Sequence, residues 1–298
     1  MVQWQGVFPA LTTKFTSEDK LDFELFKKNL AAQLTAGVHG VILGGTLGEA
    51  SVLSNEEKSD LMKFTVDQVD GAVPVVMNIA EGSTREAVRL AREAEEQGAL
   101  GLMLLPPMRY KSDDRETVNY FKTVADSTRL PIMIYNNPVD YKVEVTLDMF
   151  AELTEKKNIQ AVKESTRDVS NVTRMINRFG DRFKILCGVD TLAMEAMLLG
   201  AQGWVAGLVC AFPDETVAIY KLVQAGMITE ALKIHRWFLP LLELDLHTKL
   251  VQYIKLAEAE TGIGSEYVRA PRLTLVGEER ERILKIIRDS IAHRPRLR

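Results

Sequence analysis

The sequence is poor in the residues and segments that mark a disulfide-bonded, secreted or membrane protein. It has two cysteines, Cys187 and Cys210, and each lies in an apolar run, which favours a buried thiol over a disulfide. No segment approaches the roughly 18 uninterrupted apolar residues that span a membrane. The first residues lack a basic segment followed by a long apolar one, so we expect no signal peptide. These absences predict a soluble, cytoplasmic protein.

An excess of charge of one sign is also missing. The 37 basic and 41 acidic residues are interspersed and give a net charge of −4. Proteins that bind nucleic acid or an anionic membrane normally carry a basic patch. We therefore expect no nucleic-acid partner and no membrane partner.

The chain does contain a repeated pattern in which a short apolar run is followed by a longer amphipathic stretch. Eight such runs cover residues 6–13, 40–45, 73–80, 100–107, 130–138, 159–165, 183–190 and 203–209. Parallel strands need a crossover helix between them, and the spacing leaves room for one helix after each run. The runs show little polar alternation, which is typical of strands buried on both faces. The pattern predicts an α/β fold, a (β/α)8 TIM barrel, with a doubly wound open sheet as the alternative.

Helix signals separate the predicted strands. Ser54 or Asn55 opens one helix before two glutamates, and Ser83 opens another that ends at Gly98. Beyond residue 212 the pattern is helical throughout. We interpret residues 1–228 as the barrel and residues 229–298 as a C-terminal helical extension packed on it.

The predicted strand ends offer little to a metal ion or a nucleotide. Active sites of such barrels lie at the carboxyl ends of the strands. Those ends have Glu49, Glu164 and Asp190 nearby but none of the four histidines, whereas a divalent metal needs several converging ligands. The segment GGTLGE lacks the lysine of a Walker-type phosphate loop. We therefore expect no metal site.

A lysine and a tyrosine lie at the ends of two consecutive predicted strands. Lys163 shares one strand face with Ala161, and Tyr135 shares the corresponding face with Met133, so the two side chains should be neighbours across the sheet. A desolvated barrel mouth can lower the pKa of a lysine by roughly 3 units, to a neutral amine that attacks carbonyl groups. A phenol beside it can relay protons. The alternatives are that Lys163 reaches solvent or pairs with Glu164, and that Tyr135 only packs.

Four segments resemble the signature motifs of the class I Schiff-base barrels, the superfamily of dihydrodipicolinate synthase and N-acetylneuraminate lyase. They are GGTLGEASVLSNEEK (44–58), YNNP (135–138), AVKES (161–165) and GVD (188–190), in the family's order. The resemblance implies that Lys163 forms an imine with a 2-oxo acid and that Tyr135 is the proton relay. It also implies a homotetramer and no external cofactor, because the lysine is the electron sink.

The same resemblance implies a set of residues around the substrate. Gly45, Thr46 and Leu47 belong to the turn that binds the substrate carboxylate, where glycines let backbone N–H groups approach an anion closely. Gly188 and Val205 match positions that shape the floor of the pocket. Glu49 is expected to be a buried structural acceptor.

Several positions depart from the family pattern. The synthase has threonine where this chain has Leu47, and an arginine that holds the carboxylate of its aldehyde substrate where this chain has Asp140. It also inserts a tyrosine from a neighbouring subunit, and the aligned position here is Met108, with Tyr110 two residues later. N-acetylneuraminate lyases have Asp-Glu where this chain has Asp190 followed by threonine. These departures disfavour lysine biosynthesis and sugar-acid cleavage.

Three further stretches, at residues 105–113, 203–215 and 249–273, are most similar to 1-pyrroline-4-hydroxy-2-carboxylate deaminases of hydroxyproline breakdown. This similarity implies a dehydration and release of ammonia that yields 2-oxoglutarate semialdehyde, with Met108 in the substrate pocket and Tyr110 assisting proton transfer. The alternatives are a 4-hydroxy-tetrahydrodipicolinate synthase-like enzyme and a 2-keto-3-deoxy-sugar-acid aldolase or dehydratase. A barrel that binds a 2-oxo acid as a sensor is the alternative without catalysis.

Overall fold

The computed structural model describes residues 2–107 and 110–297, and in them the predicted barrel is confirmed. Eight parallel strands form one sheet, each inside one of the predicted apolar runs. They are β1 (Gly6–Pro9), β2 (Val41–Leu43), β3 (Val75–Ile79), β4 (Gly101–Leu104), β5 (Ile132–Asn136), β6 (Ile159–Glu164), β7 (Lys184–Cys187) and β8 (Gly203–Ala206). The alternative of an open doubly wound sheet is wrong, because β1 pairs with β8.

The barrel closes between β1 and β2 by a shorter contact than the other pairs make. An isolated parallel bridge joins Ala10 to Ile42, and the backbone N–H of Leu11 donates to the Ile42 carbonyl at 2.9 Å. The closure brings all eight strand carboxyl ends to one mouth, where active sites of such barrels lie.

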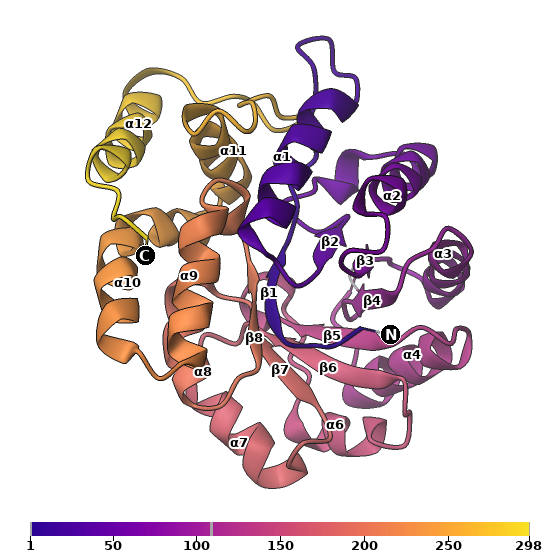
Figure 1. The fold of residues 1–298 in the computed structure, drawn as a ribbon. Helices are drawn as coiled ribbons and strands as arrows, with labels where there is room; N and C mark the ends of the chain where they lie inside the picture. The colour runs from indigo at the N-terminus through magenta and orange to yellow at the C-terminus, as the bar shows by residue number, and fades with distance from the viewer. Residues whose placement is uncertain (1, 108–109, 298) are drawn as a thin grey trace.

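Helices surround the strands, as Figure 1 shows. They are α1 (Phe23–Ala36), α2 (Asn55–Val69), α3 (Thr84–Glu96), α4 (Asp114–Asp126), α6 (Leu147–Leu153), α7 (Ser170–Phe179), α8 (Ala193–Leu198) and α9 (Pro213–Gln224), with the one-turn helix α5 (Pro138–Tyr141) directly after β5. The predicted start signals are confirmed. Ser54 and Glu57 form a reciprocal capping box at α2, and Ser83 accepts a hydrogen bond from the N–H of Glu86 at α3.

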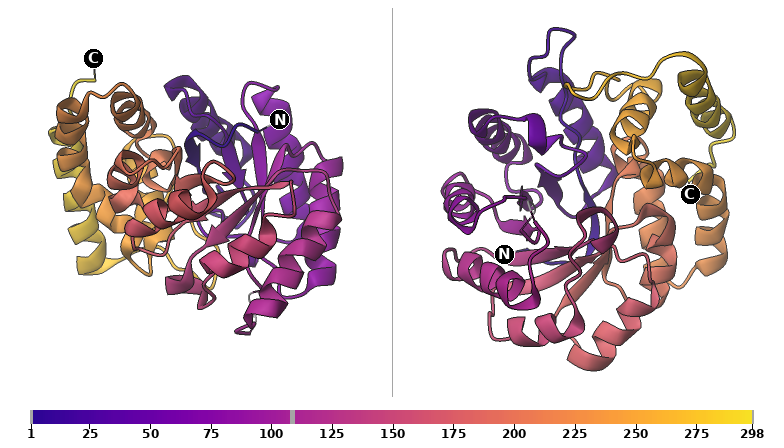
Figure 2. Two further views of the ribbon diagram at one scale, coloured as in Figure 1. Left: turned by 90° about the horizontal axis from the view of Figure 1, so that it is seen from below. Right: turned by 180° about the vertical axis from the view of Figure 1, so that it is seen from behind.

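Three helices follow the barrel: α10 (Ile228–Leu242), α11 (Leu250–Glu260) and α12 (Gly277–Ala292). Figures 1 and 2 show them on one flank of the barrel, next to α9. The short 3-10 segment η4 (Glu243–Leu246) joins α10 to the α11 region and packs against η2 (Asp190–Leu192) after β7. The division of the chain at residue 228 stays a prediction.

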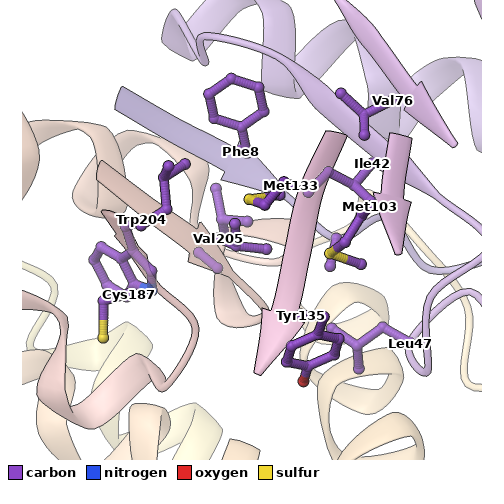
Figure 3. Packing of buried hydrophobic residues seen from close by; sticks show 14 of the residues in the cluster. Phe8, Ile42, Leu47, Val76, Met103, Met133, Tyr135, Cys187, Trp204 and Val205 are labelled. Atoms are coloured by element: carbon purple, nitrogen blue, oxygen red, sulfur yellow. The ribbon is translucent and has the colours of Figure 1, made fainter. Parts of the chain in front are cut away.

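The core fills the barrel and continues beneath the helices. Figure 3 shows Phe8, Met133 and Val205 among the apolar side chains of the strands, and all three are buried. Cys187 and Cys210 are buried free thiols, as expected from their apolar surroundings. Within residues 2–107 and 110–297, no helix has both the length and the apolar character needed to cross a membrane.

Candidate active site

A cavity of about 520 Å³ opens at the carboxyl ends of the strands. Of the residues predicted for the site, it is lined by Gly45, Thr46, Leu47, Tyr135, Lys163, Gly188 and Val205. These residues come from the ends of β2, β5, β6, β7 and β8, which are far apart in sequence. Barrel closure therefore brings the predicted set together.

Lys163 lies at the carboxyl end of β6, directly across the ladder from Tyr135 on β5. Its Nζ lies 3.9 Å from the centroid of the Tyr135 ring, and 7% of the residue is exposed. Burial lowers the pKa of Lys163, since an ammonium loses its hydration there, and nearby carboxylates offset this only in part. Burial thus shifts Lys163 toward the neutral amine inside the cavity.

The two alternative interpretations of Lys163 are wrong. Its low exposure excludes a side chain that reaches solvent. Glu164 faces other partners, because its carboxylate accepts hydrogen bonds from the Thr166 backbone N–H and from Asn171 Nδ2, each at 2.8 Å.

Tyr135 is buried in the same wall of the cavity. Its hydroxyl accepts a hydrogen bond from Asn137 Nδ2 at 3.1 Å. Burial raises the pKa of Tyr135, which keeps the phenol neutral at physiological pH and able to donate a proton. Figure 3 shows this side chain at the arrowhead end of its strand, in the same region as Leu47.

The glycine-rich turn after β2 is fixed by hydrogen bonds from neighbouring strands. Thr13 Oγ1 donates to the Gly48 carbonyl at 2.7 Å, and Asn78 Nδ2 donates to the Gly44 carbonyl at 2.8 Å. Gly44 has a φ of +69°, a conformation that glycine adopts without strain. The turn exposes Thr46 to the cavity, so its hydroxyl and the adjoining backbone can contact an anion.

Glu49 behaves as the buried structural acceptor that was expected. It is fully buried, and its carboxylate pairs with Lys255 of α11 and accepts a hydrogen bond from the Arg269 backbone N–H at 3.1 Å. Residues of the C-terminal helical region therefore hold Glu49, at the end of the glycine-rich turn after β2.

Gly188 lies against the Lys163 side chain at the end of β7. A Cβ at this position would lie 2.2 Å from Ser165 Oγ and 2.5 Å from Lys163 Cε, so a larger residue would displace these two side chains. Gly188 lines the cavity, and its role in shaping the floor of a substrate pocket stays a prediction.

One predicted residue within the described part of the chain is not among those that line the cavity. Tyr110 is 55% exposed and lies away from it in this chain, so its role in proton transfer stays a prediction. Met108 lies outside the described residues.

Sequence reasoning missed several polar residues of the cavity, among them Tyr141 and Asp245. The Tyr141 hydroxyl lies 2.7 Å from Thr46 Oγ1. A tyrosine six residues after the strand-end Tyr135, behind an Asn-Pro helix start, was a usable signal. Asp245 belongs to η4, in the extension, and no local pattern marks it.

Asp245 and Asp190 approach the same point of the cavity wall. A Cβ at Gly207 would lie 2.8 Å from Asp245 Oδ1 and 3.3 Å from Asp190 Oδ2. Asp190 is held by Trp204 Nε1 at 2.9 Å and by the Leu208 backbone N–H at 2.8 Å. Burial raises the pKa of both carboxyl groups, and for Asp245 the neighbouring Asp190 raises it further. Asp245 lines the cavity with Asp190 beside it, and this pair is called the acidic wall; the basic residues Lys58, Arg167 and Arg272 line other parts of the cavity.

Comparison with known proteins places this geometry in one family. The family model described as "Dihydrodipicolinate synthetase family" matches residues 3–290. A relative from Exiguobacterium sibiricum named 4-hydroxy-tetrahydrodipicolinate synthase is 33% identical over 92% of this chain and 92% of its own length.

Solved structures agree with the sequence matches. Dihydrodipicolinate synthase from Bacillus anthracis superposes with a TM-score of 0.93 at 29% identity, over 99% of this chain and 100% of that one. A family member from E. coli K12, solved in complex with pyruvate, has a TM-score of 0.91 at 27% identity, over 97% of this chain and 99% of that one. The chain belongs to the dihydrodipicolinate synthetase family, whose members are class I Schiff-base lyases that use a lysine and no external cofactor.

Proposed function

We propose that Lys163 attacks C2 of a small 2-oxo acid or cyclic imino acid and forms a Schiff base with it. The observation that carries this proposal is a buried amine, 3.9 Å from the centre of a buried phenol ring, in a cavity at the barrel mouth. Desolvation leaves the amine nucleophilic, which a lysine in water is not at neutral pH. The turn of Gly45, Thr46 and Leu47 holds the carboxylate next to C2.

The steps follow from the groups present. The amine adds to C2, a proton moves from nitrogen to oxygen, and water leaves to give the imine. The imine withdraws electrons from C3, so a proton can be removed there, and the neutral Tyr135 phenol relays it. Val205 and Gly188 leave room for the methyl or methylene group at C3.

The names of the relatives favour a 4-hydroxy-tetrahydrodipicolinate synthase-like reaction over the deaminase. In such a reaction the C3 carbon of the enamine attacks an aldehyde. The family's arginine for the aldehyde's carboxylate is replaced by Asp140, which lines the cavity here. The second substrate would then bind by groups other than that carboxylate.

The deaminase is the second candidate, and the acidic wall favours it. Asp140 and Asp245 line the cavity and can accept hydrogen bonds from a hydroxyl and a protonated ring nitrogen, while Lys58, Arg167 and Arg272 line it as well. Transimination by Lys163 would open the ring, proton loss at C3 would expel the C4 hydroxyl as water, and hydrolysis would release ammonia and 2-oxoglutarate semialdehyde. A keto-deoxy sugar acid would present hydroxyls to the same wall.

Borohydride reduction with pyruvate tests the Schiff base. We expect mass spectrometry to find a reduced pyruvate adduct on Lys163 in the natural protein and none in Lys163→Ala. Lys157→Ala, an exposed lysine just before β6, is the matched control and should keep the adduct. If Lys163 of the natural protein stays unmodified, the Schiff-base proposal is wrong and a barrel that binds a 2-oxo acid without catalysis is favoured.

Parallel turnover assays separate the finer activities. The substrates are pyruvate with aspartate semialdehyde, 1-pyrroline-4-hydroxy-2-carboxylate, and a 2-keto-3-deoxy sugar acid. Ammonia release from the pyrroline identifies the deaminase, consumption of the aldehyde identifies the synthase-like reaction, and faster turnover of the sugar acid identifies the aldolase or dehydratase.

We also propose a homotetramer, as the family resemblance implies. Light scattering after gel filtration measures the mass directly, and four times the chain mass of 33.4 kDa is expected.

A further inference from the structure

The helix α5 places a second tyrosine in the cavity. It begins directly after β5, where the Asn137 side chain accepts a hydrogen bond from the Asp140 backbone N–H at 3.2 Å and Pro138 occupies the first turn. Proline is favoured at this position because it has no N–H to leave unpaired. The helix ends at Tyr141, and the next residue, Lys142, has a φ of +65°. The start and end of α5 thus fix Tyr141 beside the strand that carries Tyr135.

Tyr141 contacts both Thr46, in the turn after β2, and Tyr135, the phenol next to Lys163. Its hydroxyl lies 2.7 Å from Thr46 Oγ1, and either oxygen can be the donor. Its ring meets the Tyr135 ring edge to face, with centroids 5.5 Å apart and an angle of 81° between the planes. All three residues and Lys163 line the same cavity. A tyrosine that only packed would need the ring contact but not the hydrogen bond.

The hydroxyls of Tyr141 and Thr46 can carry a proton between the buried amine and the open side of the cavity. Each hydroxyl both donates and accepts. Burial raises the pKa of Tyr141, so the phenol keeps its proton until a group in the cavity takes it. Thr46 is exposed and can exchange its proton with water.

We propose that Tyr141 is a catalytic residue that gives a proton to the departing oxygen during imine formation at Lys163. The C2–oxygen bond of the carbinolamine breaks, and the departing hydroxyl group takes the Tyr141 proton and leaves as water. The Tyr141 oxygen recovers a proton from Thr46 Oγ1, which is reprotonated by water in the cavity. The nitrogen gives its lone pair to C2 and becomes a protonated imine, and the water that reprotonates Thr46 is left as hydroxide, so charge and protons balance. This role rests on the proposed Schiff base and assigns the step that precedes chemistry at C3.

Tyr141→Phe keeps the ring contact and removes the hydroxyl, so it isolates the proposed role. We expect imine formation with pyruvate, followed by borohydride trapping over time, to slow by roughly 100-fold or more, the usual scale of acid–base catalysis. The final yield of adduct on Lys163 should be unchanged, because the nucleophile remains. Tyr267→Phe, at an exposed tyrosine, is the control and should have the natural rate.

Thr46→Val and the double variant test the link between the two hydroxyls. Thr46→Val should slow the same step, and adding it to Tyr141→Phe should slow it little further, because groups that act as one unit are not additive. Thr46→Ser keeps the hydroxyl and should therefore retain most of the natural rate of imine formation. Tyr141→Phe with an imine-forming rate within threefold of the natural protein overturns the role of Tyr141 while leaving the Schiff base intact. A natural protein that forms no adduct overturns both proposals.

Discussion

Lys163 is buried and also lines the cavity. Its neighbours at the mouth include Tyr135, which covers the amine, and the carboxyl groups of Asp190 and Asp245, which partly stabilise its charged form. Desolvation outweighs this attraction, so the pKa of Lys163 is lowered. The balance at this residue sets the pH range in which the site can react.

The first prediction concerns the pH dependence of adduct formation. In the proposed Schiff-base reaction the neutral amine is the reacting form, and a lowered pKa leaves more of it at any given pH. The trapping rate with pyruvate should therefore rise with pH and level off below 10.5, the ordinary pKa of lysine. A trapping rate that keeps rising through pH 10.5 would show that burial does not lower the pKa of this amine.

A variant at the acidic wall checks the cause of that pKa. Asp245→Asn removes a carboxyl group whose charge stabilises the ammonium, so the rising part of the profile should move to lower pH. Glu243→Gln changes an exposed carboxylate of the same segment and should leave the profile in place.

The second prediction concerns Tyr135. Tyr135→Phe should slow turnover by roughly 100-fold or more if the phenol transfers protons at the usual scale. The adduct on Lys163 should still form, since the nucleophile is intact. Steady-state turnover of the substrate identified in the parallel assays, with trapping as the companion measurement, separates the two effects. Turnover by Tyr135→Phe equal to that of the natural protein would show that Tyr135 only packs.

At the scale of elements, two buried ion pairs join α11 to the rest of the site, one at the end of the turn after β2 and one in the segment after β1. Lys255 pairs with Glu49 at the end of the turn, and Glu258 accepts from Lys14 at 2.7 Å and from Thr12 at 2.6 Å. Lys255 also donates to the Tyr267 carbonyl at 2.7 Å. A helix of the extension thus fixes the strand ends and the turn to which a substrate carboxylate would bind.

The third prediction breaks this link. Lys255→Met removes the nearer cation of the buried Glu49 carboxylate and leaves Arg272 at 3.8 Å, which should lower the free energy of unfolding by about 3 kcal/mol, the lower end of the cost of breaking a buried ion pair. Urea denaturation followed by circular dichroism measures the change. Adding Glu49→Gln should recover part of the loss, because the buried carboxylate charge is then gone. A loss below 1 kcal/mol would mean that the pair contributes little.

At the scale of the whole molecule, β1 and β8 pair along a seam where two glycines meet. A Cβ at Gly203 of β8 would lie 2.3 Å from the Gly6 carbonyl oxygen and 2.8 Å from the Gly6 nitrogen. Gly6 itself has a φ of +96°. These contacts are with backbone, which cannot move aside as a flexible side chain can. The closure that gathers the site depends on the absence of side chains at this seam.

The fourth prediction tests the seam. Gly203→Ala forces β1 and β8 apart and should cost about 1–3 kcal/mol, the usual range for overpacking, or more because the clash is with backbone. Thermal and urea unfolding report the loss of stability. Since the strand ends then shift, the trapping rate at Lys163 should also fall. A variant as stable as the natural protein would show that the seam adapts.

The barrel class was predictable from the sequence because its strands are marked locally. Runs buried on both faces lack polar alternation, and the intervening helices carry their own start signals at Ser54 and Ser83. The register of Lys163 against Tyr135 followed from the spacing of one βα unit. These features depend on neighbours along the chain, so the sequence by itself determined them.

The acidic wall and the second tyrosine were decided only by the tertiary structure. Asp245 reaches the cavity because the segment after α10 packs over Gly207, a contact between distant parts of the chain. Tyr141 meets Thr46 because closing the barrel brings the ends of β2 and β5 to the same mouth. The pKa of Lys163 is set by how much water these groups exclude, a property of the packed molecule that no local pattern of residues contains.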